Sequence, residues 1–369
     1  MAAAIGVGRF VYTPILPLMV EDLGLTQGTA GLLASANFAG YLAGALLAAT
    51  AWVTGSRRRW LFAGLIASAL TTGAMALVAS TPAFLLLRLA GGAASALGLV
   101  FASALVLDGL AEAARPELSA LHFAGVGVGI ASSAVLSSAL TALGGGWRSI
   151  WLAGGAVSLV AVVLVASLIP DRAGPAPSLA ARGRAIDRRL VAFVTAYGLF
   201  GFGYIITATF LVAIVRDGTH ARALEPVVWL VFGLTAAPSV AFWNRVAGRV
   251  GIARAFALAC VAEAIGVAAS VMHTTAAVLL AAALVGGTFM GLTALGLIGA
   301  RRLTAGDPRS TLAVMTAAFG TGQIVGPAFA GFLHDATASF ALPSLTAIVA
   351  LLVGALLART VGPAMAPGR

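Results

Sequence analysis

Apolar stretches of about 20 residues recur along the whole chain, and this recurrence constrains the fold more than any other feature. Twelve such runs, separated by polar or Gly- and Pro-rich breaks, start near Ala2, Gly28, Trp60, Pro82, Leu118, Trp147, Leu190, Pro226, Ile252, Thr275, Ser310 and Ser339. About 20 apolar residues in a helix cross the hydrocarbon core of a bilayer. With 60% hydrophobic residues, 9% charged residues and a mean hydropathy of +1.04, we expect an all-α membrane protein with twelve transmembrane helices.

The 22 basic residues are all arginines, and their distribution predicts the orientation. If the N-terminus is cytoplasmic, seventeen of them fall on the cytoplasmic side and three, Arg148, Arg216 and Arg222, fall outside. Such a bias marks cytoplasmic loops, so we expect both termini in the cytoplasm and the chain in a bacterial inner membrane. The net charge of +10 does not indicate nucleic-acid binding, because the arginines are scattered over short loops without a stacking platform.

The first apolar run is expected to stay in the mature chain. No basic region precedes it, and Arg9 interrupts it where a signal peptide would be uniformly apolar. Only eight residues come before Arg9, so we expect either that the chain begins late or that the first helix is short. The single Cys260 permits no internal disulfide and says nothing about the compartment.

Nothing in the sequence indicates an enzyme. The Gly-rich stretches lie inside apolar helices rather than between a strand and a helix, where a nucleotide cradle would be. The sequence shows neither a Cys/His metal set nor a nucleophile-base pairing, so we expect no cofactor and no metal.

A polar segment at residues 170–189 divides the chain into two halves, 1–169 and 190–369. Its three prolines and five arginines are typical of a cytoplasmic linker. A shift of 195 residues places six glycines of the first half on glycines of the second, among them Gly8 on Gly203 and Gly125 on Gly320. We therefore expect two six-helix repeats, a known transporter plan in which the substrate site lies between the halves.

These features resemble the major facilitator superfamily over essentially the whole chain. Four segments, 8–10, 36–41, 196–204 and 322–327, look like its YbfB/YjiJ-type branch. The resemblance implies that helices 1, 4, 7 and 10 line a central cavity, that helices 2, 5, 8 and 11 flank it, and that helices 3, 6, 9 and 12 lie outside.

The superfamily motifs are only partly kept. Arg88, Gly92 and Ala96 resemble the helix 4 pattern associated with proton coupling in antiporters. Trp52 stands where an aspartate is usual, so the cytoplasmic gate is expected to close by other contacts. The glycine-proline motif of drug antiporters falls around Pro327 in helix 11 instead of helix 5, which argues against an antiporter.

Arg9 is the most informative polar residue. It lies ten residues before the end of the first run at Met19, and therefore about 15 Å from the outer face of a core that is about 30 Å thick. A charge at that depth needs a water-filled cavity, a partner or an anion. Two interpretations remain open: Arg9 binds an anionic group of a substrate, or it is structural and paired with a carboxylate or with carbonyls. The repeat shift places Tyr204 in its register.

Other candidates fall into two sets. Substrate-binding candidates beside Arg9 are Tyr12, Asn37, Tyr41, Arg88, Tyr197, Phe200, Tyr204, Thr207 and Gln323. Packing or interhelical hydrogen bonding is the alternative for each of them, and for Asn37 and Tyr41 the partner would be the substrate or helix 11. Candidates for coupling or gating are Glu263, His122, Asp108 and Arg57. Glu263 is expected to be buried, but on helix 9, which the resemblance places at the periphery, so packing is the alternative for it. Hydrogen bonding is the alternative for His122, and Asp108 is expected to pair with one of Arg57–Arg59 or with Arg115.

We expect a monomeric secondary transporter, surrounded by lipid, that moves a small anionic or zwitterionic organic solute by alternating access. Whether protons are coupled remains open, because no carboxylate can be placed in the cavity at mid-depth. An alternative is proton-coupled efflux of amphipathic drugs, which Met290, Met315, Phe200 and Phe319 favour. An alternative of another class is a non-transporting membrane sensor or interaction protein. This alternative is disfavoured because the sequence shows no soluble domain that would pass on a signal.

Overall fold

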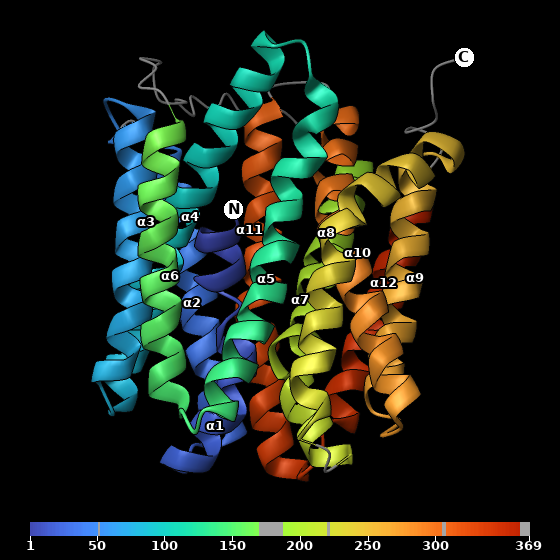
Figure 1. Ribbon diagram of the computed structural model, residues 1–369. Helices are drawn as coiled ribbons and strands as arrows, with labels where there is room; N and C mark the ends of the chain where they lie inside the picture. Colours follow the sequence, from blue (N-terminus) through green and yellow to red (C-terminus); the bar gives the residue numbers. More distant parts are fainter. Residues whose placement is uncertain (51, 170–186, 220–221, 305–307, 362–369) are drawn as a thin grey trace.

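The computed structural model describes residues 1–50, 52–169, 187–219, 222–304 and 308–361. These residues form a bundle of helices in which 12 are long and apolar enough to cross a membrane (Figure 1). The prediction of an all-α chain with twelve spans is confirmed. Most of the expected linker, residues 170–186, lies outside the described residues, as do Arg172, Arg182, Arg184 and Arg369.

Each helix begins within three residues of its predicted start. The first span comprises η1 (Ala2–Val7) and α1 (Tyr12–Leu23), and it is followed by α2 (Gln27–Ala48), α3 (Arg57–Ala74) with η2 (Met75–Leu77), α4 (Thr81–Glu112), η3 (Pro116–Leu118), α5 (Ser119–Ala142) and α6 (Trp147–Leu168). The second half contains α7 (Arg188–Thr219), α8 (Leu224–Val250), α9 (Ile252–Ser270), α10 (Thr275–Leu303), α11 (Pro308–Thr337) and α12 (Ala341–Thr360).

The first span is not a continuous α-helix. Residues 2–7 form a π-helical turn in which Gly8 N donates to Ala3 O, five residues back, over 2.9 Å. Regular α-helix starts only at Tyr12. Pro14 has no N–H to donate to the preceding turn, and the glycines at 6 and 8 weaken the helix before it. Arg9 therefore lies in a helix interruption, a kind of irregularity that is frequent at functional sites.

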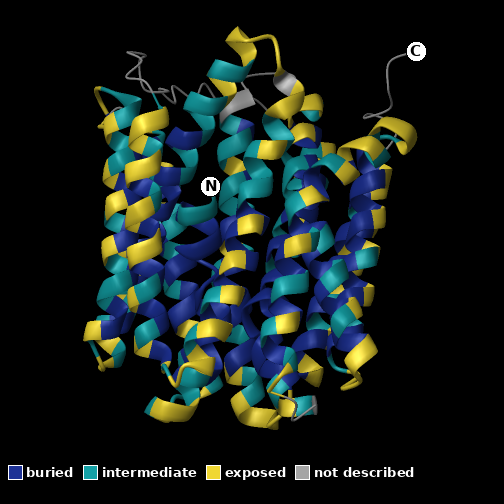
Figure 2. Cartoon of the chain, in the orientation of Figure 1, coloured by how far each residue is buried: buried dark blue, intermediate teal, exposed yellow. Residues whose placement is uncertain are grey.

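Close backbone contacts join the first six spans to the last six. Helix α2 packs on α11, α5 packs on α8, and α1 packs on α7. Small residues permit this approach: a β-carbon on Gly127 of α5 would lie only 2.6 Å from the carbonyl oxygen of Gly233 on α8. Figure 2 shows the buried residues concentrated in the middle of the bundle.

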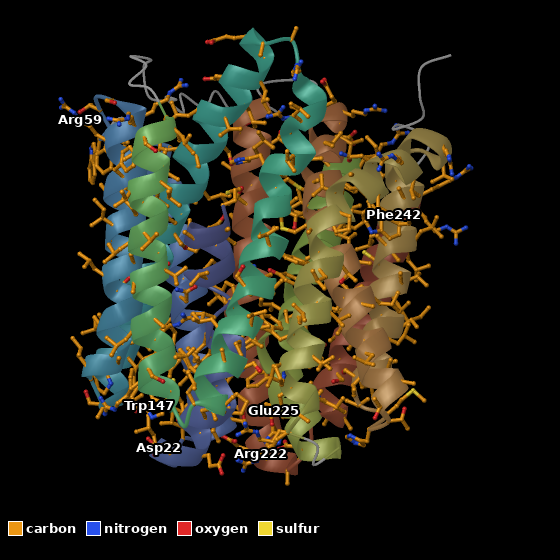
Figure 3. The ribbon with its side chains drawn as sticks, viewed as in Figure 1. Asp22, Arg59, Trp147, Arg222, Glu225 and Phe242 are labelled. Atoms are coloured by element: carbon orange, nitrogen blue, oxygen red, sulfur yellow. The ribbon has the colours of Figure 1, made fainter. Side chains whose placement is uncertain are left out.

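The two ends of the bundle carry different residues. Asp22, Trp147, Arg222 and Glu225 lie at the lower end in Figure 3, and Arg59 lies at the upper end. We refer to them as the Glu225 end and the Arg59 end. Met1 lies between them, within the height of the bundle (Figure 1). The prediction that the Arg59 end is cytoplasmic rests on the arginine distribution alone.

Candidate functional site

Arg9 lies buried against aromatic rings. Arg9 is only 7% exposed. Its Cζ is 4.1 Å from the ring centre of Tyr41, 4.7 Å from that of Phe38 and 5.8 Å from that of Phe10. Ring faces attract a guanidinium through their quadrupoles. Nε and Nη2 have no hydrogen-bond partner, and among the described residues no carboxylate forms an ion pair with Arg9.

The second half of the chain completes this aromatic site through α7 and α10. The ring of Phe289 is 5.9 Å from that of Phe10 and 5.7 Å from that of Tyr204. Tyr204 lies close enough to Arg9 for the two to interact electrostatically. The structure thus brings together the cation and the hydroxyl that the repeat register paired.

Gln323 of α11 holds the Tyr204 hydroxyl in place. Its Nε2 donates a hydrogen bond to Tyr204 Oη. The Oε1 atom of Gln323 is buried and has no partner. These contacts form one site, which we call the Arg9 site. It consists of Arg9, Tyr41, Tyr204 and Gln323 together with the rings of Phe10, Phe38 and Phe289.

Arg88 lies close enough to Arg9 for the two cations to interact, but its own contacts are with other residues of the first half. Its Cζ lies 4.6 Å from the ring centre of Tyr12 and its Nε donates to Leu33 O over 3.3 Å. Tyr12 Oη in turn donates to Ala30 O over 2.8 Å. These bonds join α1, α2 and α4, so the contacts of Arg88 and Tyr12 are structural.

Asn37 also joins α2 to α4. Its Nδ2 donates to Arg88 O over 2.9 Å, whereas the sequence suggested helix 11 or the substrate as its partner. The bonded partner is helix α4 and not helix 11, because Gly92 lets the backbone of α4 approach that of α2 at Asn37 and brings Arg88 O within reach of the amide. Asn37 Oδ1 remains buried without a partner.

The other candidates on α7, which are Tyr197, Phe200 and Thr207, make their contacts within the second half. The Tyr197 ring stacks on Phe319 at 4.9 Å and its hydroxyl donates to Thr293 O over 3.3 Å. Phe200 is fully buried against Tyr204 and Phe319. Thr207 is also fully buried, and its Oγ1 has no hydrogen-bond partner.

Three of the four coupling and gating candidates have local partners. Arg57 Nη1 pairs with Asp108 Oδ2 at 2.5 Å, which confirms the predicted pairing of Asp108. His122 Nε2 lies 3.2 Å from Ser103 Oγ, so the histidine is hydrogen-bonded. Both contacts lie within the first half and do not join the two halves.

Glu263 differs from the other candidates. It is fully buried, and neither of its carboxylate oxygens has a hydrogen-bond partner. Helix α9 packs on α10 and α12. The burial of Glu263 agrees with the sequence prediction, and its side chain turns inward from α9 rather than outward to lipid.

A polar network at the Glu225 end was missed by the sequence analysis. Arg216 Nη2 pairs with Glu225 Oε2 at 2.7 Å, and its Nη1 lies 3.1 Å from Glu21 Oε2. Arg222 Nη2 binds Glu21 Oε1 at 2.8 Å, and this bond raises the pKa of the exposed Arg222 guanidinium. Glu21 and Arg216 are separated by 195 residues, the repeat shift, which was the one available signal.

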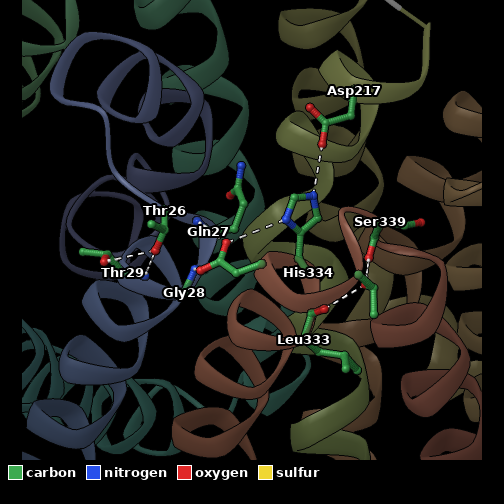
Figure 4. Close-up of polar contacts among 10 residues, drawn as sticks. Thr26, Gln27, Gly28, Thr29, Asp217, Leu333, His334 and Ser339 are labelled. Carbon is green, nitrogen blue, oxygen red and sulfur yellow. Dashed lines mark hydrogen bonds and ion pairs between the residues drawn. The ribbon is translucent and has the colours of Figure 1, made fainter.

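Further contacts close the same end (Figure 4). Asp335 Oδ1 and Oδ2 accept hydrogen bonds from Gln27 N at 3.0 Å and Gly28 N at 2.9 Å, at the start of α2. Free N–H groups at a helix start favour such a carboxylate. His334 Nε2 lies 3.5 Å from Asp217 Oδ2.

Neutral hydrogen bonds also connect the halves, among them Ala328 N to Ser35 Oγ over 3.2 Å. Thr13 Oγ1 donates to Ala208 O over 2.9 Å, again across 195 residues, and Trp229 Nε1 donates to Ser133 Oγ over 3.1 Å. The two halves are therefore held together at the Glu225 end.

Comparisons with known proteins agree with this architecture. Residues 1–359 match the family described as "Uncharacterised MFS-type transporter YbfB". A chloramphenicol resistance protein of Streptomyces lividans is 32% identical over 238 residues, which cover 63% of this chain and 57% of that protein's length.

Solved structures show the same fold. A mutant form of the nucleoside transporter NupG is similar with a TM-score of 0.71, 15% identity and coverage of 99% of both chains. A bacterial homolog of the human lysosomal transporter Spinster, solved inward-facing and unoccupied, is similar with a TM-score of 0.64 and 15% identity, covering 99% of this chain and 94% of that one.

Proposed function

Because the chain belongs to the YbfB-type family of major facilitator superfamily transporters, we propose that it carries small organic anions with an apolar body by alternating access. The family and the similar structures are transporters and not enzymes. Twelve apolar spans in this family make the chain a multi-pass membrane protein. The charge of the solute is the part of the proposal that rests on the Arg9 site.

The state of the Arg9 guanidinium is the observation that carries this proposal. A buried cation without a carboxylate is costly, and the rings offset only part of that cost. Nε and Nη2, the two nitrogens without partners, form one edge of the guanidinium. Their N–H bonds are parallel, which is the geometry that binds both oxygens of a carboxylate.

The rings around Arg9 favour a solute whose remainder is apolar. Phe10, Phe38 and Phe289 surround the cation with apolar faces. Tyr41 and Tyr204 add hydroxyl groups close to the guanidinium. An aromatic carboxylate would place its charge on Arg9 and its ring among these side chains.

The distribution of contacts supports alternating access between the halves 1–169 and 190–369. The inter-half ion pairs of Arg216 and Arg222 and the hydrogen bonds of Asp335 lie at the Glu225 end. Breaking these contacts would allow the halves to rock about the Arg9 site. Since the arginine distribution predicts a cytoplasmic Arg59 end, we propose that this state is closed to the outside of a bacterial inner membrane, and that both termini are cytoplasmic.

Binding of benzoate, with neutral benzamide as its matched counterpart, tests the role of Arg9. The purified protein should bind benzoate, measured by tryptophan fluorescence, at least about tenfold more tightly than benzamide, because charge-assisted hydrogen bonds contribute about 1.5–3 kcal/mol each. Arg9→Gln should abolish this preference, and Arg9→Lys should restore only part of it, because lysine keeps the charge but loses the paired N–H groups.

Phenylacetate and benzenesulfonate extend the binding test to other anions of the same class. Uptake of benzenesulfonate into proteoliposomes tests movement, because a sulfonate does not cross the bilayer as a free acid. The proposal fails if Arg9→Gln binds and moves these anions as the unchanged protein does. It also fails if none of the anions binds to the unchanged protein.

A second candidate function is efflux of neutral amphipathic drugs. The 32% identity to a chloramphenicol resistance protein favours it, although the match covers 57% of that protein. Overexpression in a sensitive bacterium distinguishes the two functions. Resistance to chloramphenicol that persists in Arg9→Gln would support drug efflux, whereas an anion carrier should confer none.

A further inference from the structure

A buried carboxyl group lies in the second half, beside the Arg9 site, without a cation. Glu263 of α9 is fully buried and both its oxygens lack a hydrogen-bond partner. It lies eleven residues after Ile252, the start of its helix, and therefore about 16 Å into the bundle. An ionised carboxylate in such surroundings is costly unless a proton or a cation neutralises it.

The neighbouring hydroxyl group of Thr288 indicates that Glu263 is neutralised by a proton rather than by a cation. The Thr288 side chain of α10 faces Glu263. Its Oγ1 already donates its only proton within α10, to Leu284 O at 2.7 Å and to Val285 O at 3.2 Å. While Thr288 makes these bonds, its oxygen can only accept a hydrogen bond from Glu263, and only a protonated carboxyl group has a hydrogen to donate to it.

Few other titratable groups act on Glu263. Tyr204 of α7 and Cys260 of α9 interact with it electrostatically. The charged residues described on α7, α8, α9, α10 and α12 lie toward the helix ends: Arg188, Arg189, Arg216, Asp217, Glu225, Arg245, Arg249, Arg254, Arg301, Arg302 and Arg359. Within the described residues, no group of three or more His, Cys, Asp or Glu side chains forms a metal site. A metal cation would need several oxygen ligands, whereas a proton needs one.

Glu263 and the Arg9 site share the same segment of α10. Thr288 faces Glu263, and the next residue, Phe289, contacts the rings of Phe10 and Tyr204. The Tyr204 hydroxyl group interacts electrostatically with both Arg9 and Glu263. Tyr204 is therefore the residue on which both charged groups act.

From this geometry we infer that Glu263 binds a proton that travels with the anion on Arg9, so that the protein is a proton–anion symporter. The inference rests on the proposed function. An anion on Arg9 adds a negative charge close to Tyr204, on which an ionised Glu263 also acts, and so favours the protonated, neutral form of Glu263. By reciprocity the bound proton strengthens anion binding. The proton is taken from water on the side where the anion enters and returns to water where it leaves.

Infrared spectroscopy tests the proton site without any substrate. The purified protein at neutral pH should show the carbonyl stretch of a protonated, buried carboxyl group. Glu263→Gln, which has the shape of the protonated side chain, should lose this band. Glu117→Gln, the same change at an exposed carboxylate, should keep it. A band that survives in Glu263→Gln, or that is absent from the unchanged protein, overturns the proton site.

Proteoliposomes test the coupling, with benzenesulfonate as the probe, because a sulfonate stays ionised and does not cross the bilayer as a free acid. A gradient of one pH unit, alkaline inside, supports at most about tenfold accumulation at one proton per anion. The unchanged protein and Glu117→Gln should accumulate anion several-fold, whereas Glu263→Gln should accumulate none yet still exchange labelled for unlabelled anion. Thr288→Val, which removes the acceptor and keeps the shape, should shift the pH dependence of uptake.

Three outcomes contradict symport: accumulation that persists in Glu263→Gln, accumulation driven by sodium, or stimulation by the opposite pH gradient. The absence of both exchange and accumulation in the unchanged protein, together with a normal infrared band, contradicts the proposed function and leaves the proton site in place.

Discussion

Replacing Gly31 by valine should open the Glu225 end of the bundle. Gly31 of α2 faces Pro327 of α11. A β-carbon there would lie 2.8 Å from the Pro327 carbonyl carbon and 3.2 Å from Ala328 Cα, whereas carbon atoms normally approach to about 3.5–4.0 Å. The obstacle is helix backbone, so it cannot turn aside, and α2 and α11 must separate.

The size of the effect follows from the overlap. Forcing extra carbon atoms into a packed contact costs about 1–3 kcal/mol. The separation also strains the bond from Ala328 N to Ser35 Oγ, now 3.2 Å. Since the clash exists only while the halves are closed, the closed state should lose about 5- to 150-fold in population relative to an open one.

Cysteine labelling measures this shift at two sites. The chain has one cysteine, Cys260, which is buried, so an introduced thiol reports alone. Ser35→Cys reports on the α2–α11 contact beside the substitution, and Ser133→Cys reports on the α5–α8 contact. With Gly31→Val, maleimide should label both positions faster by a similar factor, because rigid halves open together.

Gly248→Val is the matched control, since Gly248 lies inside α8 with no atom within 4 Å of an added β-carbon. It should leave both labelling rates unchanged. Faster labelling at Ser35→Cys alone would mean that Gly31→Val only loosens the local contact. That result, or an equal effect of Gly248→Val, would refute the rigid opening of the halves.

Three further predictions concern the polar contacts. Arg216→Gln leaves the nearly buried Glu225 without its ion pair and should reduce stability by about 1–3 kcal/mol, seen as a lower Tm, whereas Arg222→Gln at an exposed position should leave the Tm unchanged. Arg88→Gln removes a ring contact and a carbonyl bond and should cost about 2 kcal/mol in thermal unfolding with benzoate affinity retained; an unchanged Tm with lost affinity would assign it to the substrate. Thr13→Val removes one hydrogen bond between the halves, worth about 1 kcal/mol, and should raise maleimide labelling at Ser133→Cys about fivefold; unchanged labelling would exclude a role in closure.

The helices were predictable because lipid demands long apolar runs, and the breaks between them are polar. The need of Arg9 for a partner, an anion or a water-filled cavity was also predictable, since a charge at that depth is unusual in any fold. The groups that surround Arg9 could not be predicted, because they come from distant helices. Phe38 of α2 contacts Arg9, and Phe289 of α10 contacts the neighbouring Phe10. The repeat shift anticipated that Tyr204 lies near Arg9, since equivalent residues of two repeats meet close to the axis between them.

Glu263 shows a different limit of sequence reasoning. Helix α9 is apolar on nearly every side, so its periodicity does not reveal which face turns inward. The sequence predicted a buried Glu263 on a peripheral helix, but the neighbours of that side chain depend on how the helix is rotated against α10. Asn37 is a similar case, since its partner depends on the close approach of α2 and α4 at Gly92.

The sequence by itself determined the class, the number of spans, the repeat register and the depth of Arg9, because each depends on hydrophobicity and spacing along one chain. Only the tertiary structure decided that Arg9 is held by rings with one edge free, that Arg88 is bonded to backbone, and that the halves meet at Glu21 and Arg216. The physical reason is that in lipid nearly every helix face is apolar. Which faces meet is then settled by close packing and by the few polar groups that must find partners across the bundle.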